Sequence, residues 1–265
     1  MSLIEAATSD AGDGSLAVRI EGPFAWLEFR RPDKRNALND ATVEALAAFV
    51  DAPPETVRCV ILSGAGGNFS SGLDLSEHVH RKGESVFHHS RNWHRTVEAI
   101  RYGGLPYIAV LEGAVMGGGL EIAASCHVRI AVDGAQFRMP EGKRGIFVGG
   151  GATANLSRII GADRLIEMML TGRTFDAEEA LRLGLAHYRA ERGAGPTMAR
   201  EIAERIAENS RLVNTFIVQG ISRIADMSRS EGLFAESLAA ALSTTSEDAT
   251  EGLNAFLEKR KPNFR

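Results

Sequence analysis

Short runs of apolar and β-branched residues alternate with helical patterns through the first half of the chain, and this alternation constrains the fold most. The expected strands lie at residues 24–29, 59–62, 107–111 and 128–132. Between them, Asn39 fits the N-cap of a helix, and a second helix over 85–102 places Trp93, Val97 and Ile100 on one stripe. Strands that alternate with helices predict a layered α/β core.

The pattern changes after Gly195, where only helical spacing remains. Residues 244–247 (TTSE) fit a capping box for the last helix. The helical apolar positions before it are Ile202, Ile206, Leu212, Phe216, Ile217, Ile221 and Ile224. We therefore expect a core with the active site over 1–195 and a helical subdomain over 196–265. Its surplus apolar faces favour self-association, whereas residues 5–15 are expected to be a frayed tail.

Charge and cysteine content exclude several classes of protein. The chain has 265 residues with 30 basic and 34 acidic side chains, a net charge of −4, which argues against a nucleic-acid partner. Its apolar stretches fall far short of the roughly 20 residues that cross a bilayer, and its N-terminus lacks the pattern of a secretory signal. The two cysteines, Cys59 and Cys126, have no CxxC spacing. We expect a cytoplasmic protein without a membrane partner.

Glycine marks the region where chemistry is expected. Of 28 glycines, ten fall between Gly113 and Gly151. A strand, a glycine-rich turn and a helix at residues 107–124 would leave backbone N–H groups free for an anion or a developing oxyanion. This segment is neither a Walker A loop nor a dinucleotide-binding fingerprint, because the required spacings are absent. A single glycine there would be explained by a tight turn, but the clustering indicates a site.

Two carboxylates stand beside these turns. Glu121 falls in the first turn of the expected helix, and Glu141 follows Pro140 and precedes Gly142. Each alone would be explained as a helix-start acid or a loop acid, but a pair suits acid–base catalysis. A third segment, residues 68–75 (NFSSGLDL), could offer backbone groups to a ligand edge, or could be an ordinary loop capped by Asp74.

Taken in order, the motifs resemble the enoyl-CoA hydratase/isomerase (crotonase) superfamily over nearly the whole chain. The matching segments are 31–38 (RPDKRNAL), 69–75 (FSSGLDL), 108–121 (IAVLEGAVMGGGLE), 135–141 (AQFRMPE), 170–174 (LTGRT) and 256–261 (FLEKRK). The resemblance implies a spiral of ββα units with a helical C-terminal oligomerisation subdomain that builds trimers, commonly paired into hexamers. It implies an acyl-CoA substrate, with coenzyme A as part of that substrate and no separate cofactor or metal.

The resemblance also assigns roles. The N–H groups of Leu73 and Gly118 would form the oxyanion hole, Glu121 and Glu141 would be the catalytic acids, and Gly149 or Gly150 would shape a water pocket. The residues expected to bind CoA are Lys34, Arg35, Ala37, Asp74, Leu75, Phe256, Lys259 and Lys261, the last three reaching a neighbouring subunit's ligand.

Departures from the family pattern leave the net reaction open. Met139 stands where many hydratases carry Gln, and residues 142–144 (GKR) and 148–155 (VGGGATAN) also differ. The two glutamates favour hydration of a 2-enoyl-CoA, and the alternatives are double-bond isomerisation or non-catalytic acyl-CoA binding. Five histidines fall between 78 and 94, namely His78, His80, His88, His89 and His94. We interpret them as part of a variable cover over the acyl pocket rather than as a metal site.

Overall fold

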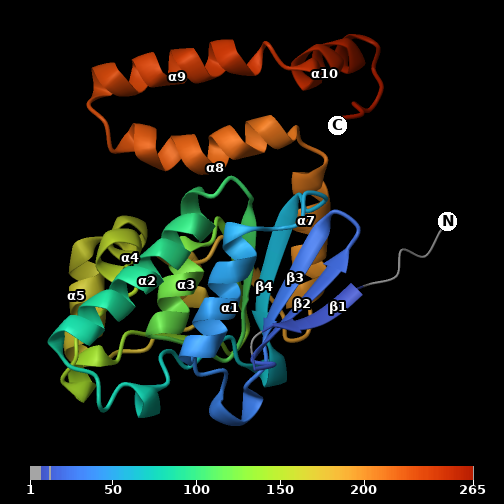
Figure 1. Ribbon diagram of the computed structural model, residues 1–265. Helices are drawn as coiled ribbons and strands as arrows, with labels where there is room; N and C mark the ends of the chain where they lie inside the picture. Colours follow the sequence, from blue (N-terminus) through green and yellow to red (C-terminus); the bar gives the residue numbers. More distant parts are fainter. Residues whose placement is uncertain (1–6, 12, 265) are drawn as a thin grey trace.

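A seven-stranded sheet forms the centre of the computed structural model, which describes residues 7–11 and 13–264 (Figure 1). The strand order is β1-β2-β3-β4-β5-β7-β9, antiparallel from β1 to β3 and parallel from β3 onward. A small second sheet pairs β6 (Ala114–Met116) with β8 (Gln136–Arg138) in parallel. The main strands are β1 (Ala7–Ala11), β2 (Leu16–Glu21), β3 (Phe24–Phe29), β4 (Cys59–Gly64), β5 (Tyr107–Leu111), β7 (Val128–Val132) and β9 (Tyr188–Ala190). The predicted α/β class is confirmed.

The N-terminal segment is more ordered than the sequence predicts. Residues 7–11 form β1 and pair antiparallel with β2, so the expectation of a frayed tail is wrong there. Residues 5, 6 and 12 of that expectation lie outside the described residues. The segment that follows is fixed by hydrogen bonds, since the carbonyl of Ser15 accepts from the amide of Arg30 at 2.7 Å and Asp13 accepts from Asn39 at 3.1 Å.

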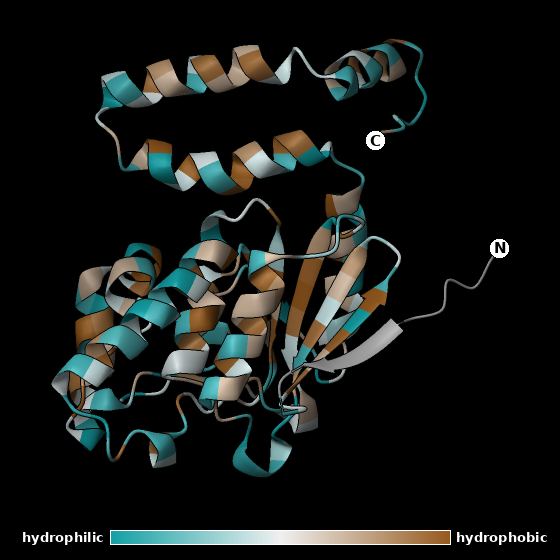
Figure 2. Cartoon of the chain, viewed as in Figure 1, coloured by the Kyte–Doolittle hydropathy of each residue, from teal (hydrophilic) through white to brown (hydrophobic). Residues whose placement is uncertain are grey.

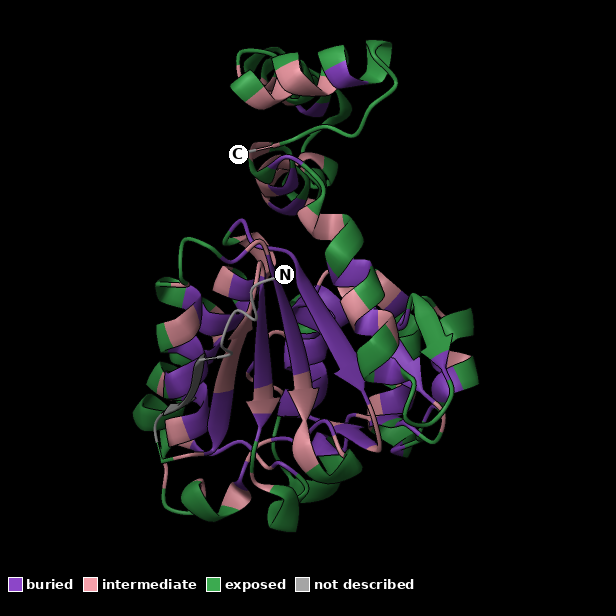
Figure 3. Ribbon diagram, turned by 90° about the vertical axis from the view of Figure 1, so that its right-hand side faces the viewer, coloured by how far each residue is buried: buried purple, intermediate pink, exposed green. Residues whose placement is uncertain are grey.

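Successive residues of the central strands face opposite layers. Leu27 and Leu62 point into a large apolar core shared with the helices from α1 to α6, whereas Trp26 and Ile61 point to a second core covered by α7. Figure 3 shows the buried strands between these layers. The helices are α1 (Asp40–Asp51), α2 (Gly83–Tyr102), α3 (Gly118–Ser125), α4 (Ala152–Ile160), α5 (Ala162–Thr171), α6 (Ala177–Arg182), α7 (Gly195–Ala207), α8 (Arg211–Ala225), α9 (Arg229–Ser243) and α10 (Glu247–Leu257).

Local signals in the sequence place the two helices nearest the site. Asn39 caps α1 as predicted, because its side chain accepts from the amide of Thr42 at 3.1 Å. On α2 the predicted stripe of Trp93, Val97 and Ile100 is buried in the main core. Helix α2 therefore lies against α1 and α3, and it also contacts α8.

Helices α8 to α10 project from the core as a separate layer (Figure 1). Helix α8 packs on α2 and α9, yet the layer carries exposed apolar side chains. The hydrophobic residues of these helices are the brown segments of the cartoon in Figure 2. A capping box does occur, but at Ser228 and Glu231 before α9. At the predicted 244–247 position, the Thr244 hydroxyl instead bonds back to Ala241 at 2.7 Å, and Ser246 caps α10. Among the described residues, no helix is long and apolar enough to span a membrane.

Candidate active site

A cavity of about 710 Å³ opens between α2, the start of α3 and the segment that leads into α4. Its walls are mainly apolar, with Glu121 and Glu141 as the two acidic residues among them. The other lining residues are Leu73, Leu75, His78, Val79, Arg81, Val86, Phe87, His89, Ser90, Trp93, Gly118, Arg144, Ile146, Phe147, Val148, Gly149 and Gly150. The volume suits a small-molecule ligand, and the apolar walls favour a hydrocarbon group beside the carboxylates.

Glu121 lies in the first turn of α3 and is 5% exposed. Its Oε1 accepts hydrogen bonds from the amides of Gly150, at 2.8 Å, and Ala152, at 3.0 Å. Burial raises the pKa of Glu121 to about 7, and these two amides limit the rise. A carboxyl group with a pKa near neutrality can hold or release a proton at physiological pH.

Gly150 is needed for this arrangement because there is no room for a side chain. A methyl carbon added there would lie 2.5 Å from Glu121 Oε2 and 2.9 Å from the indole of Trp93. Gly149 is held nearby, since its carbonyl accepts from the Ser90 hydroxyl at 2.7 Å. The segment before α4 is therefore fixed both to α2 and to Glu121.

Glu141 follows β8 and Pro140 and opens a short 3-10 helix (Glu141–Arg144). Burial raises the pKa of Glu141, and the charge of Arg144 partly opposes the rise. Its Oε2 is buried and has no hydrogen-bond partner among the described residues. A methyl carbon added at Gly117, whose φ is 49°, would lie 2.8 Å from Glu141 Oε1. The glycine turn before α3 thus makes room for the second carboxylate.

Two backbone amides converge beside the carboxylates. A methyl carbon added at Gly118 would lie 3.5 Å from the amide nitrogen of Leu73, and one added at Gly72 would lie 3.2 Å from the amide nitrogen of Gly118. Neither the Leu73 nor the Gly118 N–H donates to another described group. Gly118 is the first residue of α3, where the helix dipole adds to the local positive potential.

The segment over 68–75 is held in position by its neighbours. The Ser70 hydroxyl donates to the carbonyl of Asn36 at 2.7 Å and accepts from the amide of Gly72 at 3.1 Å. Ser70 also bridges to Val115 of β6. These contacts hold the segment between Asn36 and β6, so the Leu73 amide is preorganised.

The residues predicted to bind CoA fall into two groups. Asp74 accepts from Arg31 at 2.8 Å and from Lys34 at 3.1 Å, so its carboxylate is engaged within the chain. Arg35 and Ala37 lie in the same turn, and Leu75 lines the cavity. The second group, Phe256, Lys259 and Lys261, lies on or just after α10 in the projecting layer (Figure 1). No residue of α8 to α10 lines the cavity of the same chain, so the structure does not bring the two groups together within one chain.

Sequence reasoning missed some of the cavity walls. Trp93 was expected only as a buried residue, yet it lies between Gly118 and Gly150. Of the five clustered histidines, His78 and His89 line the cavity, which agrees with a cover over a pocket. Among the described residues, no three or more His, Cys, Asp or Glu side chains are grouped so that they could hold a metal ion. The sequence signal that could have identified Trp93 as a cavity residue is its i,i+4 spacing from His89, which places both side chains on one face of α2.

A family model described as enoyl-CoA hydratase/isomerase matches residues 19–265. The chain belongs to this family. It is 34% identical over 254 residues to the short-chain-enoyl-CoA hydratase of Clostridium acetobutylicum, covering 91% of this chain and 94% of the relative. It is 32% identical over 265 residues to enoyl-CoA hydratase EchA19 of Mycobacterium tuberculosis, covering 98% and 99%.

Solved structures agree with this assignment. A crystal structure from Rhodopseudomonas palustris CGA009, provisionally named an enoyl-CoA hydratase, superposes with a TM-score of 0.91 at 41% identity. The match covers 96% of this chain and 98% of that one. The predicted crotonase-like fold with a helical C-terminal part is therefore confirmed.

Proposed function

We propose that this family member catalyses the syn addition of water to a 2-enoyl-CoA thioester. The observation that carries the proposal is the placement of two buried carboxylates with raised pKa values, Glu121 and Glu141, on one cavity. Beside them lie two backbone amides that donate to no other described group. Membership of the enoyl-CoA hydratase/isomerase family supports an acyl-CoA substrate. Coenzyme A is then part of the substrate, and the reaction needs no separate cofactor.

The amides of Leu73 and Gly118 would act as the oxyanion hole. Addition of a nucleophile at Cβ moves negative charge onto the thioester oxygen. Two N–H donors that are already oriented stabilise that charge without reorganisation, and each is worth about 3–4 kcal/mol of activation free energy. The amide at the start of α3 also benefits from the helix dipole.

The two glutamates would divide the proton transfers. The carboxylate of Glu141, with Oε2 unpaired, takes a proton from the water as the water oxygen bonds to Cβ. Glu121, held through Oε1 and with a pKa of about 7, delivers a proton to Cα. After product release, exchange with solvent restores the starting protonation states. Gly149 and Gly150 would shape the space for the water.

The CoA moiety would be bound by both groups of predicted residues. Lys34, Arg35, Ala37, Asp74 and Leu75 would serve from the same chain. Phe256, Lys259 and Lys261 would reach the ligand of a neighbouring subunit, because in their own chain they lie in the projecting layer. This part of the proposal therefore requires self-association into a trimer or a hexamer.

Isomerisation of a double bond is the second candidate. It is favoured by the unequal environments of the carboxylates, since Glu121 Oε1 accepts two amides whereas Glu141 Oε2 has no partner among the described residues. One unpaired carboxylate is enough to move a proton between two carbons. Hydration would need both.

Glu121→Gln and Glu141→Gln test the proposal, with the exposed Glu98→Gln on α2 as a matched control. Hydratase activity on crotonyl-CoA should fall by about 10²–10⁴ in kcat for either active-site variant and stay unchanged in the control. CoA binding should persist in all three. Full activity of Glu121→Gln on a 3-enoyl-CoA would instead support the isomerase, and binding without turnover in the unaltered protein would support a non-catalytic binder.

A further inference from the structure

Trp93 lies against both Gly118 and Gly150, the two glycines that border the candidate site. A methyl carbon added at Gly118 would lie 2.6 Å from Trp93 Cη2, and one added at Gly150 would lie 2.9 Å from Trp93 Cε3. Gly118 carries one of the two site amides that donate to no other described group, and the Gly150 amide donates to Glu121. The indole is 4% exposed and fills the space between these two glycines. Its orientation therefore sets the spacing between the amide and the carboxylate.

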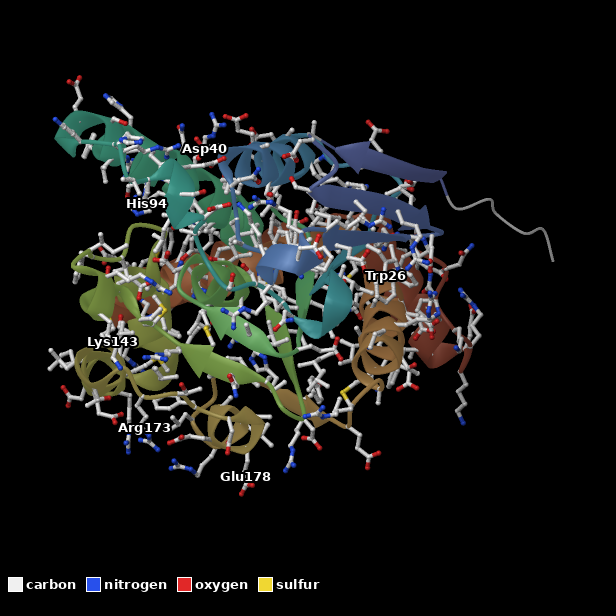
Figure 4. All side chains as sticks on the ribbon, turned by 90° about the horizontal axis from the view of Figure 1, so that it is seen from below. Trp26, Asp40, His94, Lys143, Arg173 and Glu178 are labelled. Atoms are coloured by element: carbon white, nitrogen blue, oxygen red, sulfur yellow. The ribbon has the colours of Figure 1, made fainter. Side chains whose placement is uncertain are left out.

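A single hydrogen bond directs that indole. Trp93 Nε1 donates to His89 Nε2 at 3.2 Å, one turn earlier on α2. The same His89 nitrogen lies 3.2 Å from Oδ1 of Asp40, the first residue of α1, labelled in Figure 4. A nitrogen that carries a proton donates to Asp40 and cannot accept from Trp93, whereas a bare nitrogen can accept from Trp93. The two neighbours compete for one ring atom.

We infer that Trp93 is a positioning residue for the hydration site, and that a bare His89 Nε2 holds the indole in its working orientation. The inference rests on the proposed function. Proton uptake at Nε2 turns that nitrogen toward Asp40, releases the indole and loosens the contact with Gly118 and Gly150. Trp93 and His89 thus act on the reaction through the groups that they position.

Burial, together with the charges of Arg81 and His78, keeps the His89 ring neutral near neutral pH. In the neutral tautomer that carries its proton on Nδ1, the Nε2 atom is bare. Arg81 pairs with Asp40 through the other carboxylate oxygen, Oδ2, which offsets the attraction of Asp40 for a proton on His89. His78 packs edge-on against His89 with ring centres 4.7 Å apart and, like Arg81, disfavours a second positive charge. Burial lowers the pKa of His89 and of His78, while Asp40 acts in the opposite direction on both and Glu77 on His78.

The first test compares variants at His89. His89→Gln keeps a hydrogen-bond acceptor that does not titrate, and His89→Leu removes the acceptor. His88→Gln, at the exposed neighbouring position, is the matched control. At pH about 8 we expect His89→Leu to lose about tenfold or more in kcat with a smaller change in KM, because misplaced catalytic groups slow the chemical step. The ratio of kcat for His89→Gln to that of the unaltered protein should rise severalfold as the pH falls to about 5.

The second test does not depend on turnover. The chain has two tryptophans, so Trp26→Phe leaves Trp93 as the sole indole. Its fluorescence should change with a midpoint below 6.5, and that transition should disappear when His89→Gln is added but remain with His88→Gln. A transition that survives His89→Gln, or a pH-independent kcat ratio, would overturn the inference.

The two tests separate the claims. If no enoyl thioester is hydrated but the fluorescence transition follows His89, then the proposed function fails while the hydrogen bond from Trp93 stands. If hydration occurs and the transition does not depend on His89, the function stands and the positioning role fails. A His89→Leu variant that does not fold would leave His89→Gln and the fluorescence titration to decide.

Discussion

Replacing Glu121 with Gln should slow the enzyme and stabilise its fold at the same time. The side chain is buried, and burial raises its pKa to about 7. Gln has nearly the same shape, and its carbonyl oxygen can still accept from the amides of Gly150 and Ala152. The substitution therefore removes the cost of burying a negative charge without removing the hydrogen bonds that hold the segment before α4.

The size of this effect follows from the pKa. A pKa of about 7 in the folded protein, against about 4.3 in an unfolded chain, means that ionising Glu121 destabilises the fold by about 4 kcal/mol. Because the folded state binds the extra proton, this contribution favours folding at low pH and is lost as the pH rises through about 7. Glu121→Gln should gain about 4 kcal/mol at pH about 8.5, with the advantage shrinking toward zero by pH about 4.

Urea unfolding followed by circular dichroism at several pH values measures this difference, and Glu98→Gln controls for the loss of an exposed charge. In parallel, kcat should fall by about 10²–10⁴. The reasoning is refuted if Glu121→Gln is less stable than the unaltered protein at pH about 8.5. It is also refuted if the gain does not depend on pH.

Three further predictions concern other parts of the molecule. Gly150→Ala should lower kcat by about 10² in steady-state assays, because the added carbon collides with Glu121 and shifts it. Normal activity would show that the segment before α4 moves to accommodate the added carbon without displacing Glu121. Asp74→Ala should lose about 1–3 kcal/mol in urea unfolding at neutral pH. Hydrogen bonds from Ser76 and Arg31 hold the pKa of Asp74 well below its usual range, so this loss should vanish in acid, and a loss that persists there would contradict the pairing. Leu238→Glu, on the exposed apolar face of α9, should lower the mass measured by light scattering, whereas an unchanged mass would exclude that face as a subunit contact.

The sequence predicts the parts of the fold that depend on local pattern. Strands β5 and β7 have the predicted bounds, and Asn39 caps α1, because β-branched runs and capping side chains act within a few residues. The strand β1 was missed since residues 7–11 are small and polar and gain their structure from pairing with β2. The capping box predicted at 244–247 does not form, because the Thr244 hydroxyl is already bonded at the end of α9. The capping box in the structure lies at Ser228 and Glu231.

The candidate site divides in the same way. The sequence alone could identify Glu121, Glu141 and the glycine turns, because acidic residues next to glycine clusters can be recognised from their order along the chain. The role of Trp93 could not be identified in this way, since it depends on which glycines a distant helix contacts. The raised pKa of Glu121 likewise comes from burial, which the local sequence does not specify.

Hydration of a 2-enoyl thioester is the central claim, and it can be measured directly. The purified protein would be added to crotonyl-, longer-chain 2-enoyl-, branched and cinnamoyl-type CoA thioesters, with the enoyl absorbance and the product mass followed together. The account predicts rapid loss of absorbance on at least one thioester, with a product heavier by one water. Loss of absorbance on none of them, with CoA binding demonstrated in the same preparation, would contradict it.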